Sequence, residues 1–342
     1  MNPQTLINCK WRTHRQMTGV QRYAQELVGA LSKSELAFDC ATPIQGPMWK
    51  SVIWEQHNLI RKSAGYTTLF CPANMAPVLL PQNIRLVLTI HCLRFHFHPE
   101  NYSKAFVAWY KFMIPKLIAR ADTILTVSHT VQEEIHDVYP QSMGKVKVVY
   151  PGVSSAFGVD GDSGDNSVSL GPYWVYVGNS APAKNLRVLL EALKLANHQH
   201  RICLLGICQD QFDSMNEPQL ADQIIPLGHI NDTDRVAAIL RGAIGLLSPS
   251  MYESFDLPTL EAMACGCPVI ASDTMTHREI GQDAPLFVPA CDAKQWAQML
   301  DRLLDEPLIG QSQSELGLNR ASEFSWKSAA DQVSHIIQCK AL

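Results

Sequence analysis

The sequence has no run of eighteen consecutive apolar residues, which is about the length that a helix needs to cross a bilayer. We therefore expect no transmembrane helix. The first five residues carry neither the basic segment nor the apolar segment of a secretory signal, so no signal peptide is expected. These absences together predict a protein of the cytoplasm.

Two other patterns are missing. The ten cysteines include no pair at C-x-x-C spacing, and several, such as Cys71 and Cys203, lie within apolar runs. We interpret them as reduced, mostly buried thiols and expect no disulfide framework. No G-x-G-x-x-G opens a predicted helix, which argues against an oxidoreductase that binds a dinucleotide.

What is present suffices for two domains, because 342 residues that are 46% hydrophobic can bury two cores of ordinary size. Charge is divided unevenly between the halves. Residues 1–155 hold 16 Lys and Arg against 9 Asp and Glu, whereas residues 156–342 hold 12 against 23. A basic first half suits an anionic membrane or an anionic lipid-linked substrate, although chance variation between two domains explains the asymmetry equally well.

Short apolar strands alternate with amphipathic helices along the chain. We expect strands at 5–8, 68–72, 85–91, 121–128, 146–153, 174–177, 201–205, 224–230, 244–248, 269–271 and 284–288. We expect helices at 21–31, 51–61, 101–120, 130–139, 186–196, 236–241, 259–265, 293–304, 313–323 and 325–338. This α/β order, repeated twice, predicts two Rossmann-like domains that face an interdomain cleft.

The stretch 245–273 is dense in turn and capping signals. Pro258 suits the first turn of a helix, and Gly266 suits its end. The start of such a helix presents N–H groups that attract phosphate, and Glu253 and Glu261 on either side of it offer acceptors for sugar hydroxyls. On their own, such glutamates are more often structural, with Glu253 a solvated loop acid and Glu261 a residue that favours the helix dipole.

The surrounding residues decide between these readings. E-S-F-D-L-P-T-L-E-A-M-A-C-G-C-P-V-I-A-S closely resembles the nucleotide-sugar signature of retaining glycosyltransferases of family 4, usually E-G-F-G-L-P-x-L-E-A-M-A-x-G-x-P-V-V. Ser254 and Asp256 replace the two usual glycines. A carboxylate at 256 would repel a diphosphate, unless it turns away and caps the helix N–H groups.

Three further segments resemble the same family. T-G-V-Q-R-Y-A-Q-E-L resembles its opening loop and helix, where Gly19 would approach the donor diphosphate. The strand 85–91 ends in a histidine, as in the family, and His91 would contact the donor sugar. V-G-N-S-A-P-A-K-N resembles V-G-x-x-x-P-R-K-N, where Lys184 would bind the diphosphate without the usual arginine, because Ala183 stands in its place.

The resemblance implies the GT-B fold, with a first, acceptor-binding domain at 1–155 and a nucleotide-sugar-binding domain at 156–324. It also implies that the last helix, about 325–342, crosses back to the first domain. Ile230 would lie beside the nucleotide base, Phe255 and Leu257 would meet the phosphates through their backbone, and Glu261 would hold the ribose. His91 and Glu253 would orient the sugar. No metal or other cofactor is expected, because helix N-termini and a lysine would offset the leaving diphosphate.

Metal sites were weighed at three places. Cys92, His96 and His98 follow one strand, but we expect the two histidines to alternate in an extended F-H-F-H stretch without a supporting carboxylate. The acidic pairs within 160–162 and 232–234 follow no convincing buried strand. They are interpreted as flexible acidic surface.

A basic, aromatic segment lies at 101–120. Phe106, Trp109, Tyr110, Met113 and Leu117 share one face of the expected helix, which also carries four basic residues. Such a helix either lies on a membrane or packs on the core with solvated lysines, and the second is the commoner arrangement.

The most specific hypothesis is a transferase that moves a hexose from a nucleotide sugar, GDP-mannose for example, to a polyprenyl-diphosphate-linked glycan at the inner face of the cytoplasmic membrane. A UDP-sugar-dependent transferase, a nucleotide-sugar epimerase of similar shape and a non-catalytic binding module are the alternatives. Nothing in the sequence indicates a nucleic-acid partner.

Overall fold

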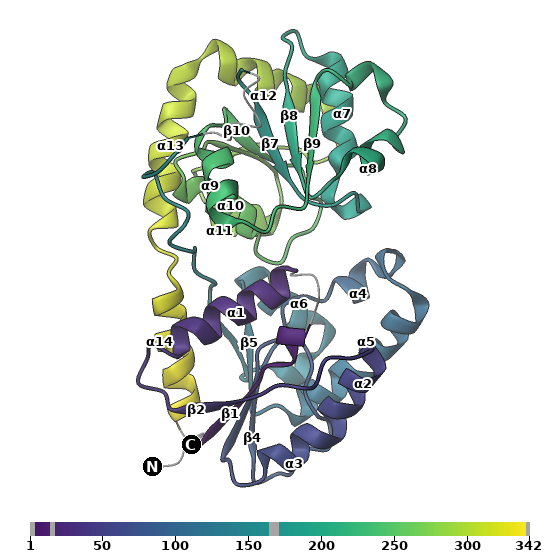
Figure 1. Cartoon of the computed structure of the whole chain (residues 1–342), viewed down its shortest axis with the longest axis vertical. Coiled ribbons are helices and arrows are strands. Elements are labelled where there is room, and N and C mark those ends of the chain that lie inside the picture. Colours follow the sequence, from purple (N-terminus) through teal and green to yellow (C-terminus); the bar gives the residue numbers. More distant parts are fainter. Residues whose placement is uncertain (1–3, 14–17, 164–170, 340–342) are drawn as a thin grey trace. The chain divides into compact units, whose positions relative to one another are not determined.

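The computed structural model describes residues 4–13, 18–163 and 171–339 (Figure 1). The chain forms two compact α/β units. Unit 1 comprises residues 1–152 and 325–342, and unit 2 comprises residues 153–324. The structure thus divides the chain between residues 152 and 153, slightly before the boundary between 155 and 156 that the sequence predicted. Among the described residues, no helix combines the length and the apolarity needed to span a membrane.

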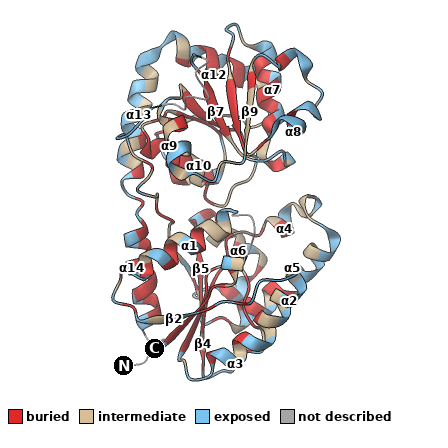
Figure 2. Ribbon diagram, viewed as in Figure 1, coloured by how far each residue is buried: buried red, intermediate tan, exposed pale blue. Residues whose placement is uncertain are grey.

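Unit 1 contains a six-stranded sheet in the order β2-β1-β3-β4-β5-β6, and every neighbouring pair is parallel. Its strands are β1 (Thr5–Asn8), β2 (Phe38–Ala41), β3 (Thr68–Cys71), β4 (Arg85–Thr89), β5 (Thr123–Thr126) and β6 (Val146–Val148). Strands β1, β3 and β5 are buried along their whole length, as expected for a parallel sheet covered on both faces. They appear red in Figure 2.

The α-helices of unit 1 are α1 (Gly19–Leu31), α2 (Met48–Ile53), α3 (Leu59–Ser63), α4 (Arg94–Phe97), α5 (Lys104–Arg120), α6 (His129–Val138) and α14 (Trp326–Gln338). A π-helical turn, Trp54–Asn58, joins α2 to α3. Helix α14 packs against α1, and the rings of Trp326 and Tyr23 meet edge to face at 5.7 Å. The last helix therefore belongs to unit 1, although it follows unit 2 in the chain.

Unit 2 contains a second parallel six-stranded sheet, in the order β12-β11-β10-β7-β8-β9. Its strands are β7 (Trp174–Val177), β8 (Ile202–Leu205), β9 (Ile224–Gly228), β10 (Gly245–Ser248), β11 (Val269–Ser272) and β12 (Leu286–Val288). Counted within the unit, this is the order 3-2-1-4-5-6 of a doubly wound Rossmann domain. The order reverses between β7 and β10, so the connections that follow these two strands lead to opposite halves of the sheet.

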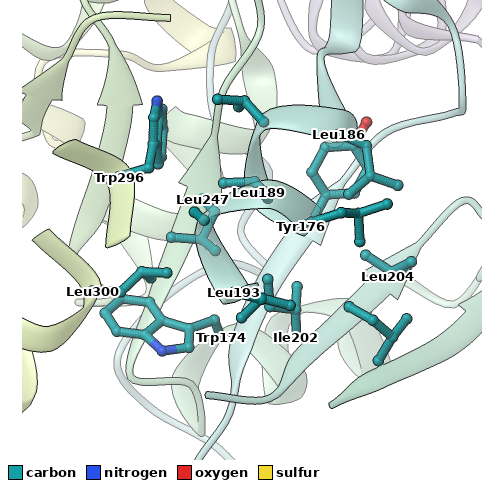
Figure 3. Packing of buried hydrophobic residues seen from close by; sticks show 14 of the residues in the cluster. Trp174, Tyr176, Leu186, Leu189, Leu193, Ile202, Leu204, Leu247, Trp296 and Leu300 are labelled. Atoms are coloured by element: carbon teal, nitrogen blue, oxygen red, sulfur yellow. The ribbon is translucent and has the colours of Figure 1, made fainter. Parts of the chain in front are cut away.

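The α-helices of unit 2 are α7 (Leu186–Leu195), α8 (Gln209–Asp213), α9 (Thr233–Arg241), α10 (Leu257–Ala264), α11 (Met275–Gly281), α12 (Ala293–Asp305) and α13 (Pro307–Ala321). Helix α12 packs against α7, and α10 packs against α9 and α13. Figure 3 shows the core between the sheet and the first of these pairs, where Trp174 and Trp296 are completely buried. This core fixes the strands whose ends carry the candidate site.

Several local predictions differ from the structure. The stretch predicted to be extended around His96 is the short helix α4, because the amides of His96, Phe97 and His98 donate to carbonyls three or four residues earlier. Strand β2 and helices α8 and α11 were not predicted. Helix α13 begins at Pro307 and not near 313, since proline is well tolerated in a first helical turn. All ten cysteines are free, but only five are buried.

Candidate functional site

The strongest cluster of predicted residues lies at the carboxyl edge of the sheet in unit 2. The loop after β7 carries Lys184, and the loop after β10, residues 249–256, carries Glu253. These two loops flank the point where the strand order reverses, which is where doubly wound domains bind ligands.

Lys184 and Glu253 form an ion pair. Lys184 Nζ lies 2.5 Å from Glu253 Oε1, and both side chains are largely shielded from solvent. The amide of Met251 also donates to the carbonyl of Ala183 over 2.9 Å, so the two loops are joined through backbone as well. The structure thus brings together a candidate ligand for a diphosphate and a candidate ligand for a sugar.

Asn185 holds the same two loops together, and the sequence analysis did not assign it a role. It adopts a left-handed backbone conformation, with φ of 51°, directly before α7. Its Nδ2 donates to the carbonyls of Pro249, at 3.0 Å, and Ala290, at 2.7 Å. The signal for this role was present in the quoted P-A-K-N segment, since asparagine is one of the few non-glycine residues that adopt this conformation readily.

Helix α10 begins beside this cluster. Its first residue is Leu257, and Pro258 occupies the first turn as predicted. The ring of Phe255 is buried and meets Phe324 edge to face at 5.8 Å, which leaves its backbone as the part that faces a ligand in our assignment. Glu261 lies one turn into the helix and is only 4% exposed. A buried carboxylate at this depth offers acceptors in a place with little competing water.

Asp256 does not cap α10, which was one of the two alternatives for this residue. Its side chain makes no hydrogen bond to the helix N–H groups. The carboxylate is buried, and its Oδ2 accepts from Ser248 Oγ at 2.8 Å and Thr259 Oγ1 at 2.5 Å and lies 3.0 Å from His277 Nε2. Its backbone is left-handed, with φ of 67°, a conformation that costs about 1–2 kcal/mol in a residue other than glycine. The negative charge therefore points into the protein.

His277 is charged in this arrangement. Its Nδ1 lies 2.7 Å from the carbonyl of Ser272, so Nδ1 must carry a hydrogen, and Nε2 must carry one to bond the carboxylate of Asp256. Burial acts to lower the pKa of His277, but the hydrogen bond and charge of Asp256 outweigh it and raise the pKa above its ordinary value. Burial acts to raise the pKa of Asp256, yet His277 holds it well below its usual range.

The remaining predicted residue of unit 2 is Ile230. It follows β9 and is partly exposed. Ala183, which stands where the resembled family has arginine, is 3% exposed. Its side chain therefore faces the interior, and only its carbonyl takes part in the cluster.

His91 and Gly19 both lie in unit 1. His91 follows β4, is buried, and has Nε2 2.8 Å from the carbonyl of Pro72, the residue after β3. Burial lowers the pKa of His91 to about 4, while its bond to Pro72 acts in the other direction. The ring is therefore neutral at pH 7 with its hydrogen on Nε2, which leaves Nδ1 as an acceptor.

Gly19 is the first residue of α1 and is exposed. A Cβ placed there meets no atom of the described structure within 4 Å. Its backbone is not left-handed, so neither internal packing nor conformation requires glycine at this position. Tyr23, one turn along the same helix, meets the ring of His91 edge to face at 4.6 Å. The two predicted residues of unit 1 thus share one neighbourhood.

Among residues 4–13, 18–163 and 171–339, no group of three or more His, Cys, Asp or Glu side chains is placed to hold a metal ion. Asp232 caps α9 by accepting from the amides of Asp234, at 3.0 Å, and Arg235, at 3.2 Å. The acidic pair at 160–162 is exposed.

A buried carboxylate in unit 1 escaped the sequence analysis. Glu55, in the π-helical turn, is 3% exposed and lies 2.8 Å from Lys10 Nζ. Asn8 Nδ2 donates to its other oxygen at 2.9 Å. Asn8 is the last residue of β1, and Lys10 follows two positions later. No sequence pattern marked Glu55, because its contacts join positions far apart in the chain.

Two family models match the chain. The model described as "Glycosyl transferases group 1" matches residues 171–306, and the model described as "Glycosyltransferase Family 4" matches residues 48–157. The chain belongs to glycosyltransferase family 4. The match includes the Lys184–Glu253 cluster and α10, so the family signature and the site coincide.

Relatives and solved structures agree with this membership. The O-antigen chain mannosyltransferase RfbU of Salmonella typhimurium is 25% identical over 224 residues, which are 64% of this chain and 61% of that protein. O-antigen chain mannosyltransferase B of Escherichia coli is 27% identical over 271 residues, 74% of this chain and 70% of that protein. The chain thus spans about three fifths of RfbU. Neither comparison favours the epimerase alternative.

Sucrose-phosphate synthase from Thermosynechococcus elongatus has a similar structure, with a TM-score of 0.80 at 20% sequence identity over 98% of both chains. At this identity the likeness concerns the fold, which is GT-B in this family 4 chain as the resemblance implied. Each of the two units accordingly has the Rossmann-like architecture that the alternation of strands and helices predicted.

Proposed function

We propose that this chain is a glycosyltransferase that moves a hexose from a nucleotide diphosphate sugar to a glycan acceptor with retention of configuration at the anomeric carbon. The observation that carries the proposal is the contact of Lys184 with Glu253 beside the start of α10, because it joins a cation for phosphate to a carboxylate for sugar hydroxyls. The mannosyltransferase relatives make GDP-mannose the first donor to test, and UDP-sugars are the alternative.

The donor would be held chiefly by unit 2. In this assignment Lys184 binds the diphosphate as a point charge, and the backbone at Phe255 and Leu257 supplies N–H groups at the helix start. Glu261 accepts from the ribose hydroxyls, and Ile230 lies beside the base. Glu253 accepts from the sugar once the diphosphate competes for its lysine.

The two residues of unit 1 keep the roles that the resemblance implied. His91 would orient the donor sugar, and its neutral ring suits this role because Nδ1 accepts a hydrogen bond without adding a positive charge. Gly19 would let the backbone approach the phosphates, as its open surroundings allow.

The chemistry we propose needs stabilisation of negative charge on the departing diphosphate. Lys184 and the N–H groups at the start of α10 supply it in a partly shielded place, where fixed charges act more strongly than in water. The leaving phosphate would take the proton of the acceptor hydroxyl during attack on the same face of the sugar. We expect no metal to be required, so chelation should leave transfer intact.

The acceptor we propose is a polyprenyl-diphosphate-linked glycan in polysaccharide biosynthesis, met at the cytoplasmic face of a membrane. Helix α5 supports peripheral contact with anionic lipid. Trp109 is 37% exposed and Phe112 55% exposed, and Lys116 Nζ lies 3.2 Å from the centre of the Phe112 ring. The helix has four basic residues and no acidic one, while its Met113, Ile114, Leu117 and Ile118 side chains are buried.

A donor screen tests the proposed function. Binding of GDP-mannose, UDP-glucose, UDP-N-acetylglucosamine and ADP-glucose is measured by calorimetry, and slow hydrolysis of each is followed without acceptor. We expect one nucleotide sugar to bind and to be hydrolysed with retention, which NMR of the released sugar reports. Absence of binding by all four would overturn the proposal, and an inverted product would overturn its stereochemistry.

A further inference from the structure

Position 256 combines a conformation that suits glycine with a side chain that glycine lacks. The resembled family has glycine at this place, and the left-handed backbone here, with φ of 67°, gives a physical reason for that glycine. This chain has aspartate in the same conformation. The side chain must therefore supply interactions that hold the residue in a sparsely populated region.

The carboxylate of Asp256 contacts three side chains that can stabilise it. Asp256 Oδ2 meets Ser248 at the end of β10, Thr259 in α10 and His277 in α11. The pair of Asp256 and His277 is buried, with the exposed fraction of the His277 residue at 0% and of Asp256 at 5%. Removal of one member of such a pair leaves the other charge buried without its partner, whereas removal of both does not.

The loop 249–256 is held at two other points. Thr276 Oγ1, in α11, donates to the carbonyl of Glu253 over 2.8 Å. Ser272 Oγ, at the end of β11, lies 3.0 Å from His277 Nδ1 and donates to the carbonyl of Ser250. The loop that carries Glu253 is thus attached to α11 at 253 and 256, and to the end of β11 at 250.

We propose that His277 is a positioning residue for donor binding. Its pair with Asp256 replaces the glycine of the family and holds the loop 249–256 in place. Glu253 and the first amides of α10 are thereby aligned for a nucleoside diphosphate sugar. This inference rests on the proposed function. The charged groups that face the pair are Lys184, which acts on Asp256, and Glu253, which acts on His277.

The first test needs no ligand. Amide hydrogen exchange is compared in the full chain, the variants His277→Leu and Asp256→Gly, and the double variant. We expect exchange at 249–257 to quicken at least tenfold in His277→Leu and to return within about threefold of the original in the double variant, because glycine adopts the left-handed conformation without a partner. Unchanged exchange in His277→Leu, or equal exchange in the single and double variants, would overturn the inference. If His277→Leu does not fold, the comparison of Asp256→Gly with the double variant decides. Amides 249–257 should then exchange no faster in the double variant than in Asp256→Gly. Faster exchange in the double variant would overturn the inference.

The second test measures donor affinity against pH, with GDP-mannose and UDP-glucose as probes. Because the pKa of His277 is raised, affinity should weaken as pH rises through that value, when the ring loses its proton and Asp256 loses its partner charge. The double variant keeps Lys184 and Glu253 but should lack this fall in donor affinity with rising pH. The same fall in donor affinity with rising pH in the double variant would contradict the inference.

The matched control is a second buried pair in unit 2, His200 with Asp301. Their Nε2 and Oδ1 atoms lie 2.8 Å apart, and His200 Nδ1 accepts from Trp174 at the amino end of β7, opposite the edge that carries the loop. His200→Leu should lower the melting temperature while leaving exchange at 249–257 and donor affinity unchanged. If His200→Leu changed exchange at 249–257 and donor affinity as much as His277→Leu does, the positioning role of His277 would be overturned. Failure of the unaltered chain to bind either probe would count against the proposed function, while the exchange test still decides this inference.

Discussion

Lys184 Nζ and Glu253 Oε1 lie 2.5 Å apart across two loops whose residues are 69 positions distant in the sequence. The contact pairs two side chains that the sequence analysis assigned to different parts of one donor. A diphosphate that binds Lys184 must compete with Glu253, and the released carboxylate is then free to accept from a sugar hydroxyl. In the assignment we propose, the pair would thus couple recognition of the diphosphate with recognition of the sugar.

Replacement of Lys184 should weaken the donor through its phosphates. We expect Lys184→Met to lower affinity for a nucleoside diphosphate roughly 10- to 100-fold, the effect of losing one charged hydrogen bond, and to change affinity for the nucleoside much less. Calorimetry with both ligands measures this. Lys194→Met is the matched control, since Lys194 Nζ lies 2.7 Å from Glu217 in the same unit. Equal losses in the two variants would contradict the assignment.

Gly19 offers a test that separates folding from function. Gly19→Ala should leave the free energy of unfolding unchanged within about 0.5 kcal/mol, because the added Cβ meets nothing within 4 Å. Transfer should nevertheless fall at least roughly tenfold, since the methyl group would intrude on the phosphates. Gly29→Ala in the same helix is the control, with equally open surroundings, and should stabilise the chain by about 0.5–1 kcal/mol without affecting transfer. Full transfer by Gly19→Ala would remove Gly19 from the site.

Acid should destabilise unit 1 through His91. Its pKa in the folded chain is about 4, below the ordinary value, so the unfolded chain binds the proton more readily and stability falls as pH drops from about 6.5 towards 4. The full effect is roughly 3 kcal/mol. Denaturant unfolding of the original chain and of His91→Asn at pH 7.5 and 5.0 measures it, and the variant should lose less stability in acid. Identical acid sensitivity would show that His91 is not buried in the neutral form.

The exposed aromatic residues of α5 predict binding to anionic vesicles. Sedimentation with vesicles containing phosphatidylglycerol should retain the chain at low salt and release it as salt rises, because exposed charges are screened. Trp109→Ser combined with Phe112→Ser should weaken retention at least roughly tenfold through the lost apolar area. Leu308→Ser, at a residue 76% exposed in unit 2, should have no effect. Retention of the double variant like that of the original would exclude α5 as the contact.

The sequence predicted those parts of the fold that depend on local patterns. The strands β4, β5, β7 and β10 are short segments with apolar centres, and the start of α10 is marked by Pro258, so position and type followed from neighbours in the chain. The short helix α4 was missed because alternating aromatic residues and histidines favour a strand locally, while the fold requires a turn after β4.

The site was predictable only where a family pattern marked it. Glu253, Glu261 and Lys184 were named from such patterns, but the contact of Lys184 with Glu253 comes from the strand order, which no local signal carries. A helix cap was one of two alternatives for Asp256, and its contact with His277 was not predicted, because that residue lies in another helix. Glu55 was missed for a similar reason, since Lys10 and Asn8, which contact it, lie 45 and 47 positions earlier in the chain.

The most direct test of the account is a crystal structure of the chain soaked with its nucleotide sugar. We predict that the phosphates lie within hydrogen-bond distance of Lys184 Nζ and of the amides at the start of α10, with the ribose hydroxyls on Glu261. A nucleotide bound at the amino ends of the strands, or held without contact to α10, would contradict the central claim.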